Sequence, residues 1–215
     1  MIITLDGPAG SGKSTTARAL AKKLGGVYLD TGAMYRSVTL LALESGTNPA
    51  DAAKLDAIAG AIAIDFQEAE GGQKVFVNGR EVTAAIRTPE IDASISAVSA
   101  HPGVREKMVA QQRGIAQKHK TVIVEGRDAG SVVFPNADHK FFLSANPAER
   151  GKRRALQTGE PAEKAQEIAK HIVERDAKDS SRLVSPLVVP RGAVEIDNSH
   201  LSLDETIEKI LQFLA

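Results

Sequence analysis

The residues best suited to chemistry stand near the start of the chain, where residues 7–14 read Gly-Pro-Ala-Gly-Ser-Gly-Lys-Ser. This is the pattern G-x-x-x-x-G-K-S, and it lies between an apolar strand-like run at residues 2–5 and a helix-like run at residues 13–24. Glycines there let successive backbone N–H groups point into one concavity, and the N-terminus of the following helix favours phosphate oxygens. The segment, which we name the glycine loop, predicts a binding site for the phosphates of a nucleoside triphosphate.

Two side chains at the end of the glycine loop have distinct predicted roles. The Lys13 ammonium would reach the terminal phosphates, and the Ser14 hydroxyl would ligate Mg²⁺. The alternative is a glycine-rich turn without a ligand, which the agreement of strand, loop and helix disfavours. The residues expected to contact the nucleotide are Gly7, Pro8, Ala9, Gly10, Ser11, Gly12, Lys13, Ser14 and Thr15.

Arginines follow two further strand-like runs. Arg36 comes shortly after the run at residues 27–29, and Arg127 comes shortly after the apolar run at residues 121–124. The planar fork of an arginine can bind two phosphate oxygens at once. A solvated helix face is the alternative for either arginine, but arginines at strand ends that face one crevice predict a second phosphate-bearing ligand.

An acid also stands at one of these strand ends. Glu125 directly follows the apolar run at residues 121–124, where a carboxylate can hold a metal-bound water. The alternative is an acid that caps a helix or lies on the surface. Glu125 is therefore a candidate to support Mg²⁺ beside Ser14.

A third cluster of charges lies late in the chain, in residues 150–154 and 174–182. Both segments belong to polar helix-like sequence with few apolar anchors, which is typical of a mobile flap. Arginines on a flap over a triphosphate would neutralise charge and exclude water. We therefore predict a mobile helical lid at residues 150–182, in which Arg153 contacts the nucleotide. A solvated face and a nucleic-acid patch are the alternatives for residues 150–154.

The elements that must position these residues alternate between strand-like and helix-like runs. Strand-like runs begin near residues 2, 27, 121, 139 and 193. This alternation predicts an α/β fold with a doubly wound, five-stranded parallel sheet of the P-loop NTPase type. Ligands of such sheets gather at the carboxyl ends of the strands, which is where the glycine loop, Glu125 and the arginines occur.

The apolar period changes between residues 62 and 85. Residues 63–66 and 74–77 are strand-like, and Asn78-Gly79 predicts a tight hairpin turn after the second of them. We expect a small antiparallel insert lobe at residues 62–85, within a single domain that spans residues 1–215.

Composition narrows the class of protein. The 215 residues include 27 basic and 27 acidic ones and no cysteine, which argues against a general nucleic-acid or membrane-surface protein and excludes thiolate chemistry. No apolar run approaches the roughly 20 residues of a membrane helix, and the first expected strand leaves no room for a leader peptide. The histidines show no metal-ligand spacing. We expect a cytoplasmic protein that binds neither nucleic acid nor a membrane.

Several segments, taken together, resemble bacterial cytidylate kinases over essentially the whole chain. Residues 125–135, which read Glu-Gly-Arg-Asp-Ala-Gly-Ser-Val-Val-Phe-Pro, carry the most specific part of the resemblance. The other matching segments are the glycine loop and residues 29–36, 86–90 and 104–106. The resemblance implies transfer of the γ-phosphoryl group of ATP to CMP or dCMP, with Mg²⁺, to give ADP and CDP or dCDP.

The resemblance also implies roles for individual side chains. Arg36, Arg127 and Arg182 would bind the phosphate of the acceptor and take part in catalysis with Lys13. Ser96, Arg105 and Asp128 would read the cytosine, because an acid and an arginine complement the amino donor and the acceptors of its edge. Asp179 and Arg175 would lie near the sugar. Thr31 and Tyr35 would complete the acceptor site.

This chain departs from the family pattern in two places. The family often has more arginine between Arg175 and Arg182, where Ala177, Lys178, Ser180 and Ser181 stand here. An acid other than glutamate is also common in the family at position 125. The lysine ammonium is a point charge, whereas the planar guanidinium group of arginine can donate two hydrogen bonds side by side. We therefore expect the lid to offer fewer bidentate donors to the triphosphate.

Other functional classes stay open at this point. A kinase for UMP, AMP or a non-nucleotide acid would share the glycine loop, as would a nucleotide-dependent switch or motor and a pure phosphate-binding module. The Asn-Lys-x-Asp base reader of a switch GTPase is missing from the sequence. We expect a monomeric enzyme whose partners are small molecules.

Overall fold

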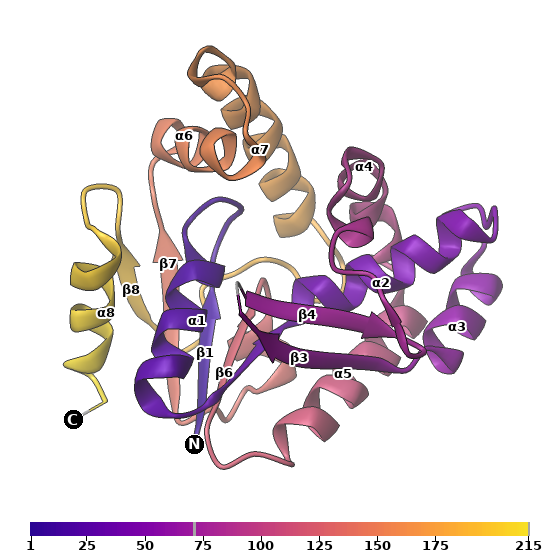
Figure 1. Ribbon diagram of the computed structural model, residues 1–215, viewed down its shortest axis with the longest axis horizontal. Coiled ribbons are helices and arrows are strands. Elements are labelled where there is room, and N and C mark those ends of the chain that lie inside the picture. The colour runs from indigo at the N-terminus through magenta and orange to yellow at the C-terminus, as the bar shows by residue number, and fades with distance from the viewer. Residues whose placement is uncertain (71, 215) are drawn as a thin grey trace. The chain divides into compact units, whose positions relative to one another are not determined.

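Five parallel strands form a sheet in the order β2-β6-β1-β7-β8, with β1 at its centre (Figure 1). The chain runs from β1 to the β2 edge, returns through β6 and then crosses to β7 and β8, which is a doubly wound topology. The predicted fold class is confirmed. The strands are β1 (Ile2–Asp6), β2 (Val27–Asp30), β6 (Val122–Gly126), β7 (His139–Ser144) and β8 (Val194–Asp197).

The computed structural model describes residues 1–70 and 72–214, and the chain divides into two units. Unit 1 comprises Met1–Leu29 and Ala116–Ala215, and unit 2 comprises Asp30–Ile115. No helix in this described part of the chain is long and apolar enough to cross a membrane. The helices of unit 1 are α1 (Lys13–Leu24), the π-helix η2 (Ala129–Val133), α6 (Pro147–Thr158), the 3₁₀-helix η3 (Ala162–Lys164), α7 (Ala165–Ser180) and α8 (Leu203–Leu211).

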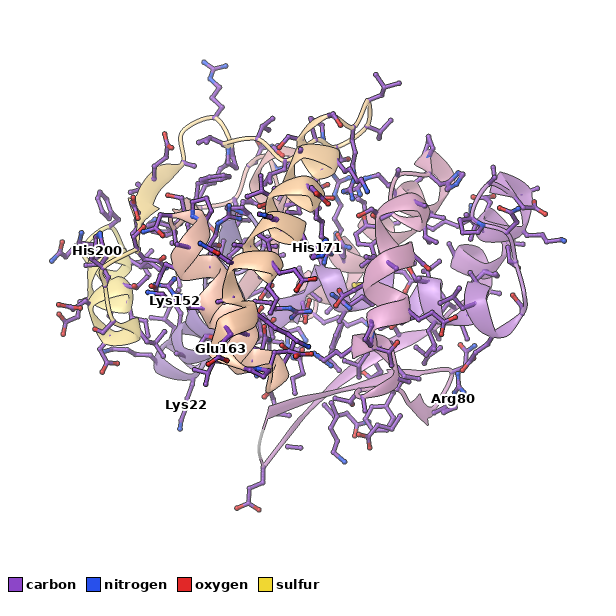
Figure 2. All side chains as sticks on the ribbon, turned by 90° about the horizontal axis from the view of Figure 1, so that it is seen from above. Lys22, Arg80, Lys152, Glu163, His171 and His200 are labelled. Atoms are coloured by element: carbon purple, nitrogen blue, oxygen red, sulfur yellow. The ribbon has the colours of Figure 1, made fainter. Side chains whose placement is uncertain are left out.

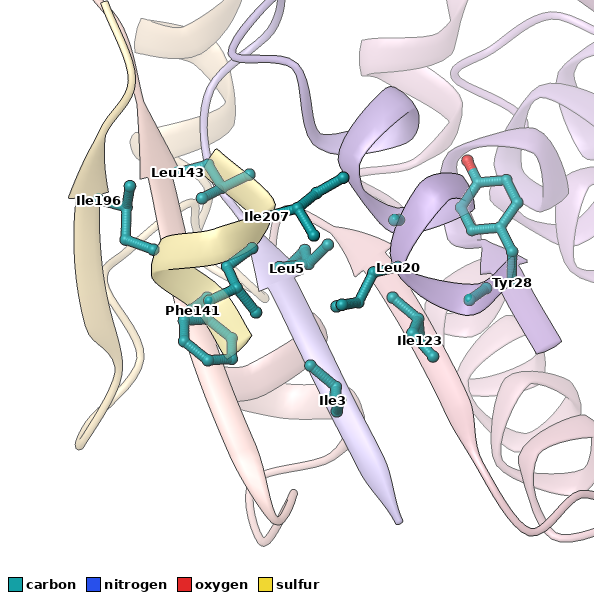
Figure 3. Packing of buried hydrophobic residues seen from close by; sticks show 12 residues of the cluster. Ile3, Leu5, Leu20, Tyr28, Ile123, Phe141, Leu143, Ile196 and Ile207 are labelled. Carbon is teal, nitrogen blue, oxygen red and sulfur yellow. The ribbon is translucent and has the colours of Figure 1, made fainter. Parts of the chain in front are cut away.

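The apolar core of unit 1 lies on the face of the sheet that α1 and α8 cover. Figure 3 shows Leu20 of α1 and Ile207 of α8 beside Leu5 of β1. Successive residues of a strand point to opposite faces, so the fully buried Thr4 and Asp6 lie on the other face of β1. The central strand is therefore buried on both faces. On the second face, its two buried side chains are the polar Thr4 and Asp6.

Two helices of unit 1, α6 and α8, begin at residues whose side chains cap them. Asn146 accepts a hydrogen bond from the backbone N–H of Glu149, and Pro147 takes the first helical position of α6. Ser202 and Glu205 form the reciprocal capping box of α8.

Helices α6 and α7 pack against each other beyond the loop that joins β1 to α1 (Figure 1). A Cβ atom on Gly151 of α6 would lie 2.3 Å from the carbonyl oxygen of Ala165, so only glycine permits this approach. Lys152, Glu163 and His171 point away from the pair into solvent (Figure 2). The structure thus has helices where the lid is predicted, while the mobility and the limits of that lid stay predictions.

Unit 2 combines helices with a three-stranded antiparallel sheet in the order β3-β4-β5. Asn78 and Gly79 have positive φ values of 49° and 81° and connect β4 to β5 in the tight hairpin turn that the sequence predicts. The elements are α2 (Thr31–Glu44), α3 (Ala52–Ala61), β3 (Ile64–Ala69), β4 (Gly72–Val77), β5 (Arg80–Glu81), the 3₁₀-helix η1 (Ala85–Arg87), α4 (Pro89–Val98) and α5 (Pro102–Ala116).

Two local features differ from the sequence-based expectation. The sequence favours a helix that starts at Ala33, but α2 begins two residues earlier, at Thr31, because the Asp30 side chain accepts a hydrogen bond from the Ala33 N–H and so caps the helix. The π-helix η2 after Asp128 was not expected. Its hydrogen bonds run from Val133 to Asp128 and from Phe134 to Ala129, a register that apolar periodicity does not reveal.

Candidate active site

The glycine loop leaves the C-terminal end of β1 and enters α1 in the conformation that its glycines allow. Gly7, Gly10 and Gly12 all have positive φ values, of 145°, 73° and 88°. A Cβ atom on Gly7 would lie 2.0 Å from the carbonyl oxygen of Leu143 in β7, so any larger residue would displace the loop. Gly12 is the N-cap residue of α1 and, because glycine has no side chain, it makes no side-chain cap hydrogen bond. The first N–H groups of α1 can therefore face a phosphate.

Lys13 is buried beneath the glycine loop, with 4% of its surface exposed. Its Nζ donates a 2.6 Å hydrogen bond to the carbonyl oxygen of Pro8. Burial and the positive charge of Arg127 lower the pKa of Lys13 to about 7, against the opposing effect of nearby carboxylates. A bound phosphate would restore the charge of this ammonium group, because an anion favours the protonated form.

Ser14 and Glu125 meet at the start of α1, although 111 positions separate them in the chain. The Ser14 hydroxyl donates a 2.7 Å hydrogen bond to one carboxylate oxygen of Glu125, and the Tyr28 hydroxyl donates a 2.7 Å bond to the other. Hydroxyl and carboxylate oxygens are the ligands that Mg²⁺ prefers, and it usually keeps waters and phosphates as its further ligands. In the part of the chain that the structure describes, no group of three or more His, Asp or Glu side chains forms a ready metal cage. The Ser14–Glu125 pair therefore fits a magnesium ion that is bound mainly through a nucleotide.

One buried carboxylate joins two of the arginines that the sequence singles out. Asp179 of α7 is 1% exposed, and its Oδ2 accepts a 3.1 Å hydrogen bond from Nε of Arg127. Its Oδ1 accepts a 2.6 Å hydrogen bond from Nη2 of Arg182. The two guanidinium groups are thereby brought together, as the binding of one phosphate by both would require. Asp128 follows Arg127 and is buried, and Arg175 lies one helical turn before Asp179 on α7.

Helices α6 and α7 contact the glycine loop through Arg150 and Asp176, which are not among the predicted site residues. Asp176 accepts a 2.9 Å hydrogen bond from the Ala9 N–H and pairs with Arg150, whose Nη1 donates a 3.1 Å bond to the Ala9 carbonyl oxygen. Arg153, expected to contact the nucleotide, donates to Asn198, which in turn donates a 2.9 Å bond to the Ser11 carbonyl oxygen. The structure places Arg153 beside the loop, where it is held by a protein partner.

The remaining predicted site residues belong to unit 2. Tyr35 and Arg105 are both buried, and the Arg105 guanidinium lies 4.9 Å above the centre of the Tyr35 ring. Arg36 pairs with Asp92 and donates a 3.0 Å hydrogen bond to the Ile86 carbonyl oxygen. Thr31 opens α2, and the half-buried Ser96 lies on α4.

Two further residues near the glycine loop were not predicted as site residues from the sequence. Tyr28 has only the pattern of an apolar strand residue in the sequence, and its hydrogen-bond partner Glu125 is far away in the chain. Asp6 did leave a signal, since it is an acid at the end of a strand that should be buried on both faces.

The sheet, the glycine loop and the buried lysine define the chain as a P-loop protein that binds nucleoside phosphates. A family model described as cytidylate kinase matches residues 3–215, and the chain belongs to this family. A cytidylate kinase from Limosilactobacillus reuteri (strain DSM 20016) is 44% identical over 215 residues, which cover 99% of this chain and 94% of that protein.

Longer relatives contain a similar segment. The bifunctional pantoate ligase/cytidylate kinase of Parasynechococcus marenigrum (strain WH8102) is 46% identical over 215 residues, and the match covers 98% of this chain but only 43% of that protein. Among solved structures, the shikimate kinase from Bacteroides thetaiotaomicron has a TM-score of 0.50 and 14% identity, with 100% of this chain and 98% of that chain covered. This last likeness concerns the fold alone.

Proposed function

We propose that the protein transfers the γ-phosphoryl group of ATP to CMP or dCMP, yielding ADP and CDP or dCDP. The observation that carries the proposal is the Lys13, Ser14 and Glu125 arrangement in a chain that matches the cytidylate kinase family over residues 3–215. An oxygen of the CMP phosphate forms a bond to the γ-phosphorus as the bond to the bridging oxygen breaks and ADP leaves. No general base is needed, because a phosphate monoester with a second pKa of about 6 is already ionised at neutral pH.

On the donor side, the backbone N–H groups of the glycine loop hold the triphosphate and Lys13 neutralises its terminal charge. Ser14 and Glu125 are the residues that would hold Mg²⁺, directly and through water. The bound ion would neutralise charge that develops on the phosphate oxygens. Arg153 is proposed to contact the triphosphate, which requires it to leave Asn198.

On the acceptor side, Arg127, Arg182 and Arg36 are proposed to bind the CMP phosphate. The support for the first two is their shared carboxylate, Asp179, which holds both guanidinium groups near one point. Two anionic phosphates must approach each other, and this positive charge offsets their repulsion. Alignment and electrostatic stabilisation then provide most of the rate acceleration.

The base is proposed to be read by Ser96, Arg105 and Asp128. The cytosine amino group would donate to Asp128, whereas uracil would present an acceptor oxygen and leave the buried carboxylate unsatisfied. Asp179 and Arg175 are proposed to lie near the sugar, and Thr31 and Tyr35 to complete the site. The cation–π contact of Tyr35 with Arg105 supports this, because it fixes the direction of the guanidinium group.

The segment 150–182 is proposed to act as a lid, and residues 62–85 as an insert lobe on the acceptor side. Arg150 and Asp176 support the lid, since they connect α6 and α7 to the glycine loop that binds the donor. We further propose a monomer in the cytoplasm that acts on small molecules.

A substrate panel tests the proposed function. The purified chain is assayed for ADP release with CMP, dCMP, UMP and AMP as acceptors, and without an acceptor. We expect turnover with CMP and dCMP well above that with UMP or AMP. Equal release of ADP without an acceptor would instead identify a nucleotide-dependent switch, and preference for UMP or AMP would contradict the specificity.

A further inference from the structure

Asp6 is the last residue of β1 and has none of its surface exposed. Its Oδ1 accepts a hydrogen bond from the Ala129 N–H and its Oδ2 accepts one from the Gly130 N–H, both at 2.7 Å. The donors follow Arg127 and Asp128 directly in the chain. The same Asp6 precedes Gly7, so one carboxylate connects the start of the glycine loop to the turn at residues 127–130.

The turn at residues 127–130 fits closely against β1 at this point. A Cβ atom on Gly130 would lie 2.6 Å from Oγ1 of Thr4 and 3.0 Å from Oδ2 of Asp6, so glycine permits the approach. The Asp128 carbonyl oxygen accepts hydrogen bonds from Val132 and Val133. The backbone around Asp128 is thus fixed by the η2 hydrogen bonds to its carbonyl oxygen and by the bonds from the next two N–H groups to Asp6.

We propose that Asp6 is a positioning residue for acceptor recognition, because it fixes the turn that carries Arg127 and Asp128 relative to the glycine loop. The inference rests on the proposed function, in which these two residues bind CMP. Asp6 itself contacts neither substrate.

The chemical environment of Asp6 supports a geometric role. Burial raises the pKa of Asp6 to about 6, while the N–H groups of Gly130 and Ala129 oppose that shift. A buried carboxylate is costly for the folded state unless its charge is compensated. The two N–H groups that compensate the Asp6 carboxylate both belong to the turn at residues 127–130, so the burial of this charge depends on the position of that turn.

An amide cannot replace this carboxylate. Two backbone N–H donors point at the two oxygens of Asp6, and both oxygens of a carboxylate accept. In Asp6→Asn, one N–H group would face the amide nitrogen, which is itself a donor. Size and shape are kept, so the substitution removes one of the two contacts and leaves the packing of β1 intact.

The test compares steady-state kinetics and amide exchange in Asp6→Asn and the wild type. We expect the KM for CMP to rise about 10- to 100-fold, the range that corresponds to one lost charge-assisted hydrogen bond. The KM for ATP should change much less, and the preference for CMP over UMP should fall. The amide hydrogens of Ala129 and Gly130 should exchange faster with solvent than in the wild type.

A matched control uses the other end of β1. Asp138 Oδ2 accepts a 2.6 Å hydrogen bond from the Ile2 N–H, so Asp138→Asn changes the same type of contact away from the turn. This variant should keep the wild-type KM for both substrates. If Asp6→Asn does not fold, Gly130→Ala pushes the turn from β1 while Asp6 is retained, and the same CMP-selective defect is expected.

Different outcomes separate the inference from the proposed function. Equal changes in the KM for CMP and ATP, or an unchanged KM for CMP despite faster amide exchange, would overturn the positioning role. A wild-type protein that does not use CMP would overturn the proposed function, while unchanged amide exchange in Asp6→Asn would overturn the inference by itself.

Discussion

Ser14 and Glu125 share a 2.7 Å hydrogen bond that joins the first turn of α1 to the end of β6. The second carboxylate oxygen of Glu125 is occupied by Tyr28, whose hydroxyl lies 2.7 Å away. The carboxylate is thus oriented before any ligand binds. A bound Mg²⁺ would compete for the Ser14 hydroxyl oxygen, whereas the Tyr28 contact can persist.

Tyr28→Phe should weaken the use of Mg²⁺ and leave the fold unchanged. Tyr28 is 4% exposed and packs in the core of unit 1, so phenylalanine keeps the packing and removes only the hydroxyl group. We expect a higher Mg²⁺ concentration for half-maximal turnover, by about 3- to 10-fold, for the loss of one hydrogen bond. Turnover measured over a magnesium titration, with urea unfolding as the stability control, checks this. An unchanged magnesium dependence would exclude Tyr28 from the metal site.

Binding of ATP at pH 8 should take up protons. With a pKa of about 7 in the ligand-free protein, Lys13 is mostly neutral at pH 8, and the triphosphate recharges it. Titration calorimetry in buffers of different ionisation enthalpy should show an uptake of about one proton per ATP, since the phosphates are already ionised at this pH. Lys13→Met should abolish the uptake and lower kcat by about 100-fold or more. A binding enthalpy that does not vary with the buffer would contradict the assignment.

Asp128→Asn should impair the use of CMP far more than the binding of ATP. The buried carboxylate is proposed to accept from the cytosine amino group, and a lost charge-assisted hydrogen bond corresponds to about a 10- to 100-fold higher KM. Asparagine can also donate to the O4 of uracil, so the ratio of kcat/KM for CMP over UMP should fall. The measurement is steady-state kinetics with both acceptors. An unchanged KM for CMP would remove Asp128 from base reading.

Asp179→Asn should destabilise the protein, because two arginines lose a shared buried counter-charge. Removing one member of a buried ionic group typically costs about 3 kcal/mol in the free energy of unfolding. Urea unfolding of the variant and the wild type gives this difference. The control is Glu81→Gln, which breaks the exposed Lys74–Glu81 pair and should leave stability unchanged within error. Equal stability of Asp179→Asn and the wild type would show that solvent compensates both guanidinium groups.

Because its pKa is raised, Asp6 should lower the free energy of unfolding of the protein as the pH rises from 4 to 6. Its pKa is raised from 3.8 to about 6 in the folded protein, so the folded state binds more protons than the unfolded state in this window. This excess of bound protons sets the sign. The contribution of Asp6 to the free energy of unfolding is fully present below pH 4 and is lost as the pH passes 6, a loss of about 3 kcal/mol. Unfolding of the wild type and Asp6→Asn at several pH values isolates this effect, because the other acids cancel in the difference. A difference that is constant with pH would contradict the raised pKa.

Much of the fold was determined by the sequence itself, because the relevant physics is local. The glycines of residues 7–14 allow positive φ values, Thr88 and Pro89 start α4, and Asn78-Gly79 closes a two-residue hairpin. Each of these depends only on neighbouring residues. The glycine loop could therefore be predicted as a phosphate site, and the type and order of the elements followed from their apolar period.

The partners of the buried charges were decided by the tertiary structure alone. Asp6 meets the turn after Asp128 because β1 and β6 are neighbours in the sheet, and Asp179 meets Arg127 because α7 returns to the same end of unit 1. More than 50 positions separate the members of each contact in the chain. A buried carboxylate must find donors, but composition and periodicity do not say which ones, because any segment that the topology brings near can supply them.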